Sequence, residues 1–165
     1  MRSLALLIVL NLAACVGAPD PLEYERAPAD FTLDITVQGP AEPTLPRAQR
    51  PARYIVEPDG VLRVGVGEGV SEDYYPPQTR QLTHNNVDRL WRLIRDSSLL
   101  APDNPDRIRP GRPLGMAQPR PAAQIIVTFG GTTNYFRVLL DGETPGSESG
   151  LRLIDHLAGL AWIEQ

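Results

Sequence analysis

Residues Phe31–Gln38 read FTLDITVQ, a stretch in which apolar and polar side chains alternate strictly. Positions 31, 33, 35 and 37 are apolar, and the positions between them are polar. Successive side chains of a β-strand point to opposite faces, so this period of two predicts a strand with one buried face. A fold built around this strand therefore needs a cover for its apolar side.

Two β-hairpins are predicted further along the chain. The first pairs Tyr54–Val56 with Val61–Val66 across the turn Glu57–Gly60, in which Pro presets one φ angle and Gly tolerates positive φ. The second runs from Gln124 to Leu140 and turns at two consecutive glycines. Its second arm divides into two faces: Phe136, Val138 and Leu140 on one, and Tyr135, Arg137 and Leu139 on the other.

An amphipathic helix is predicted after each hairpin. Thr83 can cap the first helix, and its apolar residues recur at the spacing of one helical face: Val87, Leu90, Trp91 and Ile94. On the opposite side, Asp88, Arg92 and Asp96 lie four residues apart and can pair. The second helix is expected to start at Ser147 or Ser149 and to end near Ile163, with apolar residues at 151, 154, 158 and 161.

The predicted order is therefore strand, hairpin, helix, hairpin, helix. Antiparallel strands with one apolar face need a cover, and two amphipathic helices supply it. We predict an α+β fold, a mostly antiparallel sheet of about five strands covered on one face by two helices. The segments Gly39–Arg53, Ser71–Gln81 and Ala101–Pro121 are predicted to be loops. Whether the two hairpin-helix halves arose by duplication stays open.

The start of the chain resembles the signal peptide of a bacterial lipoprotein. Arg2 precedes a short apolar run, Leu4–Leu10, and the sequence Leu12-Ala13-Ala14-Cys15 fits the lipobox of that class. The run is shorter than the roughly 20 apolar residues that a membrane span needs. The resemblance implies cleavage before Cys15 and fatty acylation of Cys15, which anchors a protein stably when two or more chains are attached. The alternative is an ordinary secretory signal peptide with a coincidental cysteine.

This resemblance also divides the chain. Residues 1–14 would be the removed signal peptide, residues 15–30 the acylated cysteine and a flexible tether, and residues 31–165 one domain. Val16, rather than Asp, follows the cysteine. In the lipoproteins that the chain resembles, this implies the outer membrane if the organism has one. Cys15 is the only cysteine, so its acylation would leave no thiol for a disulfide or a metal site.

Composition argues against a nucleic-acid partner. The sixteen basic residues are all arginine, and the net charge is −4 at pH 7. Binding to a phosphate backbone requires clustered positive charge. Gly65, Gly67 and Gly69 do not lead into a helix and no lysine is present, so we expect no phosphate loop and no cofactor. A glycine within a strand is more typical of a bulge or a close approach of another group.

No catalytic or metal-binding motif is evident. His84 and His156 lack a second histidine or an acid at zinc-ligand spacing on their own helices. The stretch Gly146–Gly150 reads GSESG, with Glu rather than Ser at its centre, so it is not a hydrolase elbow. We expect no metal and no enzyme activity. The alternative is an envelope hydrolase that uses His84 or His156 as a base with distant residues.

Two loops carry residues typical of recognition surfaces. Tyr74 and Tyr75 stand beside two prolines, and tyrosine is enriched at binding hot spots. Arg107, Arg109 and Arg112 could contact an acidic partner or an anionic lipid head group. The alternative for each loop is an ordinary solvated connection, with one Tyr packed on the sheet in the case of the tyrosine loop. We expect a membrane-anchored binding or assembly module of the cell envelope, and a purely structural envelope protein is the other alternative.

Overall fold

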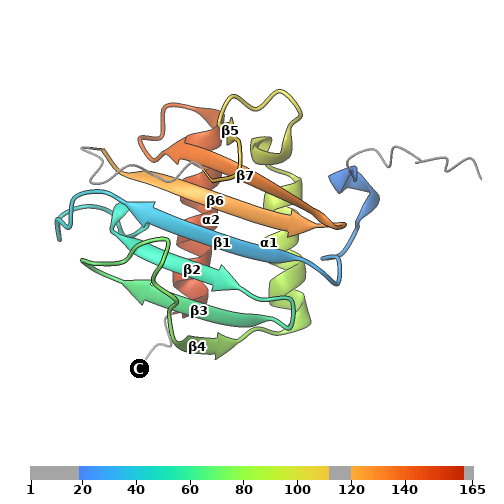
Figure 1. Ribbon diagram of the computed structural model, residues 1–165, viewed down its shortest axis with the longest axis horizontal. Coiled ribbons are helices and arrows are strands. Elements are labelled where there is room, and N and C mark those ends of the chain that lie inside the picture. The colour runs from blue at the N-terminus through green and yellow to red at the C-terminus, as the bar shows by residue number, and fades with distance from the viewer. Residues whose placement is uncertain (1–18, 112–119, 162–165) are drawn as a thin grey trace, which may run out of the picture.

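A computed structural model describes residues 19–111 and 120–161 of the chain. They form one seven-stranded antiparallel sheet with two helices behind it, which confirms the predicted α+β class (Figure 1). The strand order is β4-β3-β2-β1-β6-β7-β5. Within the described ranges, no helix combines the length and the apolar character that a membrane crossing requires.

The strands and helices have the following bounds. The strands are β1 Thr32–Gln38, β2 Ala52–Val56, β3 Val61–Val66, β4 Gln78–Gln81, β5 Arg107–Ile108, β6 Ala122–Phe129 and β7 Thr132–Leu139. The α-helices are α1 His84–Arg95 and α2 Pro145–Ala161. Three short 3-10 helices complete the fold: η1 Pro21–Glu23, η2 Arg47–Gln49 and η3 Ser98–Leu100.

Strand β1 lies at the centre of the sheet, between β2 and β6. Ile35 is paired with Tyr54 on one side and with Ile125 on the other. The four apolar residues of the alternating stretch are at most 1% exposed. They face the helices, so the pattern of residues 31–38 correctly predicts both the strand and its buried face.

The glycine turns of both hairpins also match the sequence pattern. Gly60 ends the β2–β3 turn with φ +82°, and the β6–β7 turn contains Gly130 and Gly131 with φ +55° and +72°. These angles lie in the left-handed region, which residues other than glycine rarely adopt. In both hairpins the chain therefore reverses its direction at glycines with positive φ.

The prediction of about five strands is too low, because two strands lie within segments predicted to be loops. Strand β4 has no buried side chain, so it shows no alternation that could identify it. Its register on β3 shifts between Leu62 and Arg63, where the Val64 N–H donates to the Thr79 hydroxyl (3.1 Å). Strand β5 is only two residues long. Both are edge strands, which are commonly short and polar.

The two helices cover one face of the sheet. Helix α1 is capped by Thr83 as predicted, and Leu90, Trp91 and Ile94 are fully buried. Helix α2 starts earlier than predicted, at Pro145, because the Thr144 hydroxyl accepts the N–H of Ser147 (3.1 Å). Its buried apolar residues are Leu153, Ile154, Leu157 and Ala158. The predicted end near Ile163 lies outside the described residues.

Residues 19–30, predicted to belong to a flexible tether, pack against the domain. The Tyr24 ring makes edge contacts with Trp91 and Phe129, both at 6.2 Å between centroids, and the Trp91 indole N–H donates to the Tyr24 carbonyl (2.8 Å). The Ala27 N–H donates to Asp88 (3.0 Å). The carboxylate of Asp30 accepts the N–H groups of both glycines of the β6–β7 turn (3.0 and 2.6 Å). Residues 15–18 of the predicted tether lie outside the described residues.

Candidate functional site

The loop that carries Tyr74 and Tyr75 lies on the sheet face away from the helices. It joins β3 to β4 and crosses in front of β2 in Figure 1. Tyr74 packs directly on Gly65, where any Cβ would overlap the Tyr74 ring. Gly65 therefore allows the Tyr74 ring to approach the strand closely, which is a common role of glycine within a strand. The loop is a packed cover over this half of the open face.

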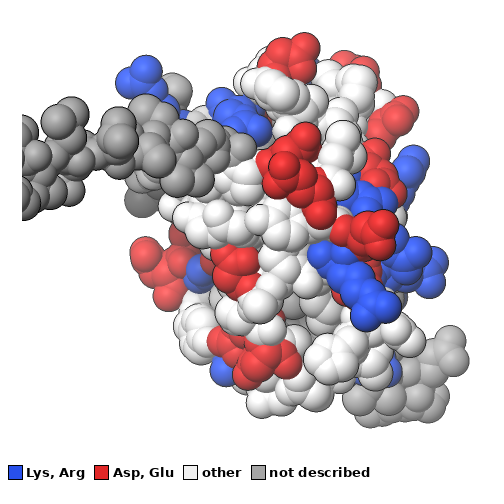
Figure 2. All heavy atoms as spheres, turned by 90° about the vertical axis from the view of Figure 1, so that its right-hand side faces the viewer, with Lys and Arg blue, Asp and Glu red and all other residues white. Residues whose placement is uncertain are grey.

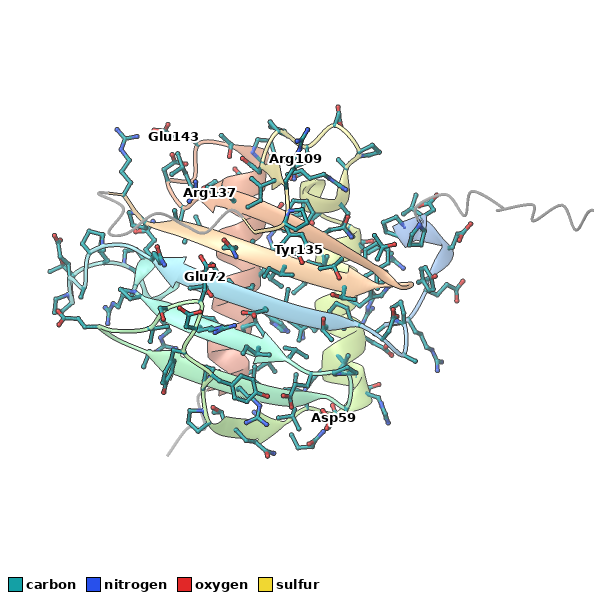
Figure 3. All side chains as sticks on the ribbon, viewed as in Figure 1. Asp59, Glu72, Arg109, Tyr135, Arg137 and Glu143 are labelled. Atoms are coloured by element: carbon teal, nitrogen blue, oxygen red, sulfur yellow. The ribbon has the colours of Figure 1, made fainter. Side chains whose placement is uncertain are left out.

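Arg53 on β2 holds this loop in place. Its guanidinium forms a two-point pair with Asp34 (3.1 and 2.7 Å) and donates to the carbonyl oxygens of Ser71, Glu72 and Tyr74. The Arg53 side chain is only 12% exposed. Figure 3 shows Glu72 in front of the sheet, in the segment that Arg53 binds. One arginine thus satisfies three loop carbonyls and one strand carboxylate.

Tyr75 belongs to a second cluster on the same face. Its hydroxyl donates to Glu57, Arg63 pairs with Glu57 (2.9 Å), and the Arg63 guanidinium lies 4.6 Å from the centre of the Tyr75 ring. The hydrogen bond from Arg63 and then that from Tyr75 lower the pKa of Glu57, and the bond to Glu57 raises the pKa of Tyr75. Tyr75 is 60% exposed, although its hydroxyl is bonded to Glu57.

Of the predicted arginines, Arg107 and Arg109 lie at the other edge of the sheet. Arg107 on β5 donates to the Asn134 side chain (2.9 Å), and its guanidinium lies 5.4 Å from the centre of the Phe136 ring. Arg109 is exposed beside β5 (Figure 3), and Arg112 lies outside the described residues. Five inter-strand steps separate β3 from β5, about 24 Å at the usual strand spacing. The structure therefore does not bring the tyrosines and Arg107 together on one surface.

Neither histidine forms a hydrogen bond or ion pair with an acid or a hydroxyl among the residues that the structure describes. His84 is exposed in the first turn of α1, and His156 is half-buried on α2, where its Nε2 atom has no hydrogen-bond partner. Burial, followed by the positive charge of Arg89, lowers the pKa of His156. Among the described residues, no three of the His, Cys, Asp and Glu side chains are grouped so that they could hold a metal ion.

A groove between α1 and α2 is lined by three arginines that the sequence analysis did not predict to form a site. It has a volume of about 710 Å³ and receives Arg89 and Arg92 from α1 and Arg152 from α2. At one end the hydroxyls of Ser98 and Ser149 lie 3.3 Å apart. In Figure 2, basic residues gather on the right, which is the helix side, with acidic residues among them. The groove thus places three guanidinium groups from two helices around one hollow.

The charges around this groove differ from those predicted for α1. We predicted pairing among Asp88, Arg92 and Asp96, but Asp88 instead accepts the N–H of Ala27, and Asp96 pairs with Arg95 (2.7 Å). Arg92 donates only to the carbonyl of Asp88 among the described groups (3.4 Å).

None of the three groove arginines forms an ion pair with a carboxylate in the described ranges. Glu148 and Asp96 at the rim keep the groove from being uniformly basic.

The groove could have been suspected from the spacing of α1. Arg89, Arg92 and Arg95 recur every third residue on its polar side, which places them on neighbouring positions of one face. The contribution of Arg152 had no such signal, because it depends on how α2 packs beside α1. Chemically, the groove can bind a carboxylate or a phosphate, since guanidinium donors match both groups.

Comparison with known proteins adds no relative: no protein-family model matches the chain, and no curated protein is significantly similar to it.

Proposed function

We propose that the protein is a lipid-anchored binding module of the bacterial cell envelope, and that the α1–α2 groove binds an anionic group of its partner. The lipobox-like sequence Leu12–Cys15 supports the anchor, and Val16 after it favours the outer membrane. The groove supports the binding role. This role is recognition and not catalysis.

The observation that carries the binding role is that the groove arginines have no carboxylate partner among the described residues. Arg89, Arg92 and Arg152 come from two helices and converge on one hollow without a carboxylate partner in the described part of the chain. Arginine donates through a planar fork and pairs with a carboxylate or a phosphate through two parallel hydrogen bonds. A ligand that bridges both helices would therefore satisfy donors that the fold leaves available.

The test is calorimetric titration of the purified lipidated protein in detergent with two probes, hexaglutamate and inorganic phosphate. We expect saturable binding of at least one probe. The double variant Arg89→Gln/Arg152→Gln should weaken it by about tenfold or more, since a tenfold loss is about 1.4 kcal/mol, near the lower end for a hydrogen bond to a charged group. A preference for hexaglutamate would indicate an acidic protein segment, and a preference for phosphate a phosphorylated ligand.

Arg109→Gln is the matched control, because Arg109 is an exposed arginine in the other predicted surface. It should leave the affinity unchanged. If Arg109→Gln weakens binding as much as a single groove substitution does, or if neither probe binds saturably, the assignment of the groove is wrong.

A further inference from the structure

The packed N-terminal segment fixes which end of the domain lies nearest to Cys15. Only residues 16–18 separate Cys15 from Pro19, the first described residue. Four residue steps reach at most about 14 Å when fully extended. An acylated Cys15 would therefore hold Pro19 within that distance of the bilayer.

Pro19 itself lies at the β6–β7 turn. A Cβ atom added to Gly130 would lie 3.0 Å from the Pro19 side chain and 2.7 Å from the Tyr24 hydroxyl. Downstream, the Tyr24 ring packs against both Trp91 and Phe129. This segment cannot swing to the other end of the sheet without losing these contacts and those of Asp30 with the turn.

The same end carries the most exposed large apolar side chain among the described residues. Leu22, in η1, is 73% exposed, and it lies only three residues after Pro19. Behind it is a hollow of about 620 Å³, whose apolar lining includes Pro21, Leu100, Pro102 and Phe129. An exposed leucine at this position has a defined neighbour if the chain is acylated, namely the bilayer itself.

We propose that this end of the domain, formed by η1, the β6–β7 turn and the adjoining end of α1, docks on the bilayer that holds Cys15, with Leu22 entering its interface. The proposal rests on the lipid anchor of the proposed function and adds the orientation of the domain. Burying a leucine side chain favours such contact by the hydrophobic effect. The anchor holds that side chain close to the bilayer.

Charge indicates that the contact is apolar and not electrostatic. Asp20 and Glu23 flank Leu22, and Figure 2, which views this end, shows acidic residues spread over it. The two arginines that line the hollow have internal partners: Arg95 pairs with Asp96, and Arg107 donates to Asn134. An anionic surface would repel the two acids beside Leu22. The docking should therefore occur on zwitterionic vesicles and persist at high salt.

The lone cysteine allows a direct test. Once Cys15 is acylated, a new cysteine is the only thiol, so Leu22→Cys and Val66→Cys can each be labelled with an environment-sensitive fluorophore. Val66 is 58% exposed and pairs through β2 and β1 with the start of β6, at the end of the sheet opposite to Phe129. It lies about 20 Å from that end along the strands, which makes it the matched control.

The labelled proteins are reconstituted into phosphatidylcholine vesicles that contain spin-labelled lipid. We expect a blue shift and strong loss of fluorescence at position 22, and the emission of a water-exposed dye with little loss at position 66. Equal quenching at the two positions would overturn the proposal. Shielding of position 22 from aqueous iodide without quenching by lipid would also overturn it, because a protein would then cover this end.

A separate readout distinguishes failure of the anchor from failure of the orientation. If the wild-type protein reacts with maleimide and does not float with the vesicles, Cys15 is free and the lipid anchor is wrong. If it floats and does not react, but positions 22 and 66 are quenched alike, the anchor stands and the orientation is wrong.

Discussion

Arginines on the two faces of this protein are bonded in different ways. On the open face of the sheet, Arg53 and Arg63 each pair with a carboxylate, and Arg53 also donates to three loop carbonyls. On the helix layer, Arg89 and Arg152 line a groove and pair with no carboxylate among the described residues. The residue type is the same in both regions.

The difference lies in the number of internal partners. A guanidinium has five N–H donors, and a fold that satisfies most of them uses the side chain to hold structure. A guanidinium that keeps its donors in water adds little to stability but can give them to a ligand. The comparison therefore predicts opposite results from substitutions at the two sites: loss of stability on the open face, and loss of binding at the groove.

The largest effect is expected for Arg53→Met, which keeps the length of the stem and removes the guanidinium. It leaves Asp34 and the carbonyls of the loop without their shared donor, so the free energy of unfolding should fall by about 2 kcal/mol or more. Urea denaturation measures this change. Arg152→Met is the matched control and should change the free energy of unfolding by less than about 0.5 kcal/mol. Equal losses would remove the distinction between the two regions.

A smaller effect is expected for Gly65→Ala, which tests the cover over the open face. The new methyl group would overlap the Tyr74 ring, which must then move away from the sheet. We expect a loss of about 1 kcal/mol in the free energy of unfolding, at the low end for overpacking because an aromatic side chain at the surface can yield. In a Tyr74→Ala background the same substitution should cost almost nothing. A cost that persists there would mean that Tyr74 does not pack on Gly65.

Arg89→Gln should raise the pKa of His156 without returning it fully to its ordinary value. Burial is the main cause of the lowered pKa and remains, whereas the positive charge of Arg89 is removed. Because the pKa of His156 is lowered in the folded protein, the unfolded chain takes up this proton first as the pH falls below about 6.5. The contribution of His156 to the free energy of unfolding is therefore fully present above that pH and is lost below it, less steeply in the variant. An NMR titration of His156 that does not change in the variant would place Arg89 away from α2.

The smallest effect is expected for Tyr75→Phe. The hydroxyl that donates to Glu57 is lost, while the stronger contribution of Arg63 stays, so the pKa of Glu57 should rise only slightly. A carboxylate with a lowered pKa stabilises the fold above its unfolded pKa, and this contribution is lost as the pH falls through the folded value. Carboxyl NMR shifts of Glu57 measure the change. A larger rise than that caused by Arg63→Met would reverse the assigned order of the two contributions.

The elements that bury a regular set of side chains could be predicted from the sequence. Burial in one core explains both regular patterns: the alternation of residues 31–38 and the helical spacing of Leu90, Trp91 and Ile94. Strands β4 and β5 could not be predicted in this way. They pair through their backbones at the edges of the sheet and bury no side chains, so their sequences show no alternation. The groove could be predicted only in part, since the helical spacing relates Arg89 to Arg92 but only the tertiary packing adds Arg152.

The packing of residues 19–30 shows the same limit. Their Pro- and acid-rich composition predicts a tether, but two of their side chains form contacts that no local pattern reveals. Tyr24 packs on Trp91, and Asp30 binds the glycine turn 100 residues away. These two side chains, together with the backbone hydrogen bonds of Tyr24 and Ala27, attach a segment whose composition alone predicts a free chain.

The most direct test of the account is the lipid anchor, because both the envelope location and the orientation of the domain depend on it. Cys15→Ser is compared with the wild-type chain by membrane fractionation and by metabolic labelling with a fatty acid. We predict that the wild-type protein is labelled and remains with the membrane, and that the variant is unlabelled and leaves it. A Cys15→Ser variant that is still labelled and still retained would contradict the account.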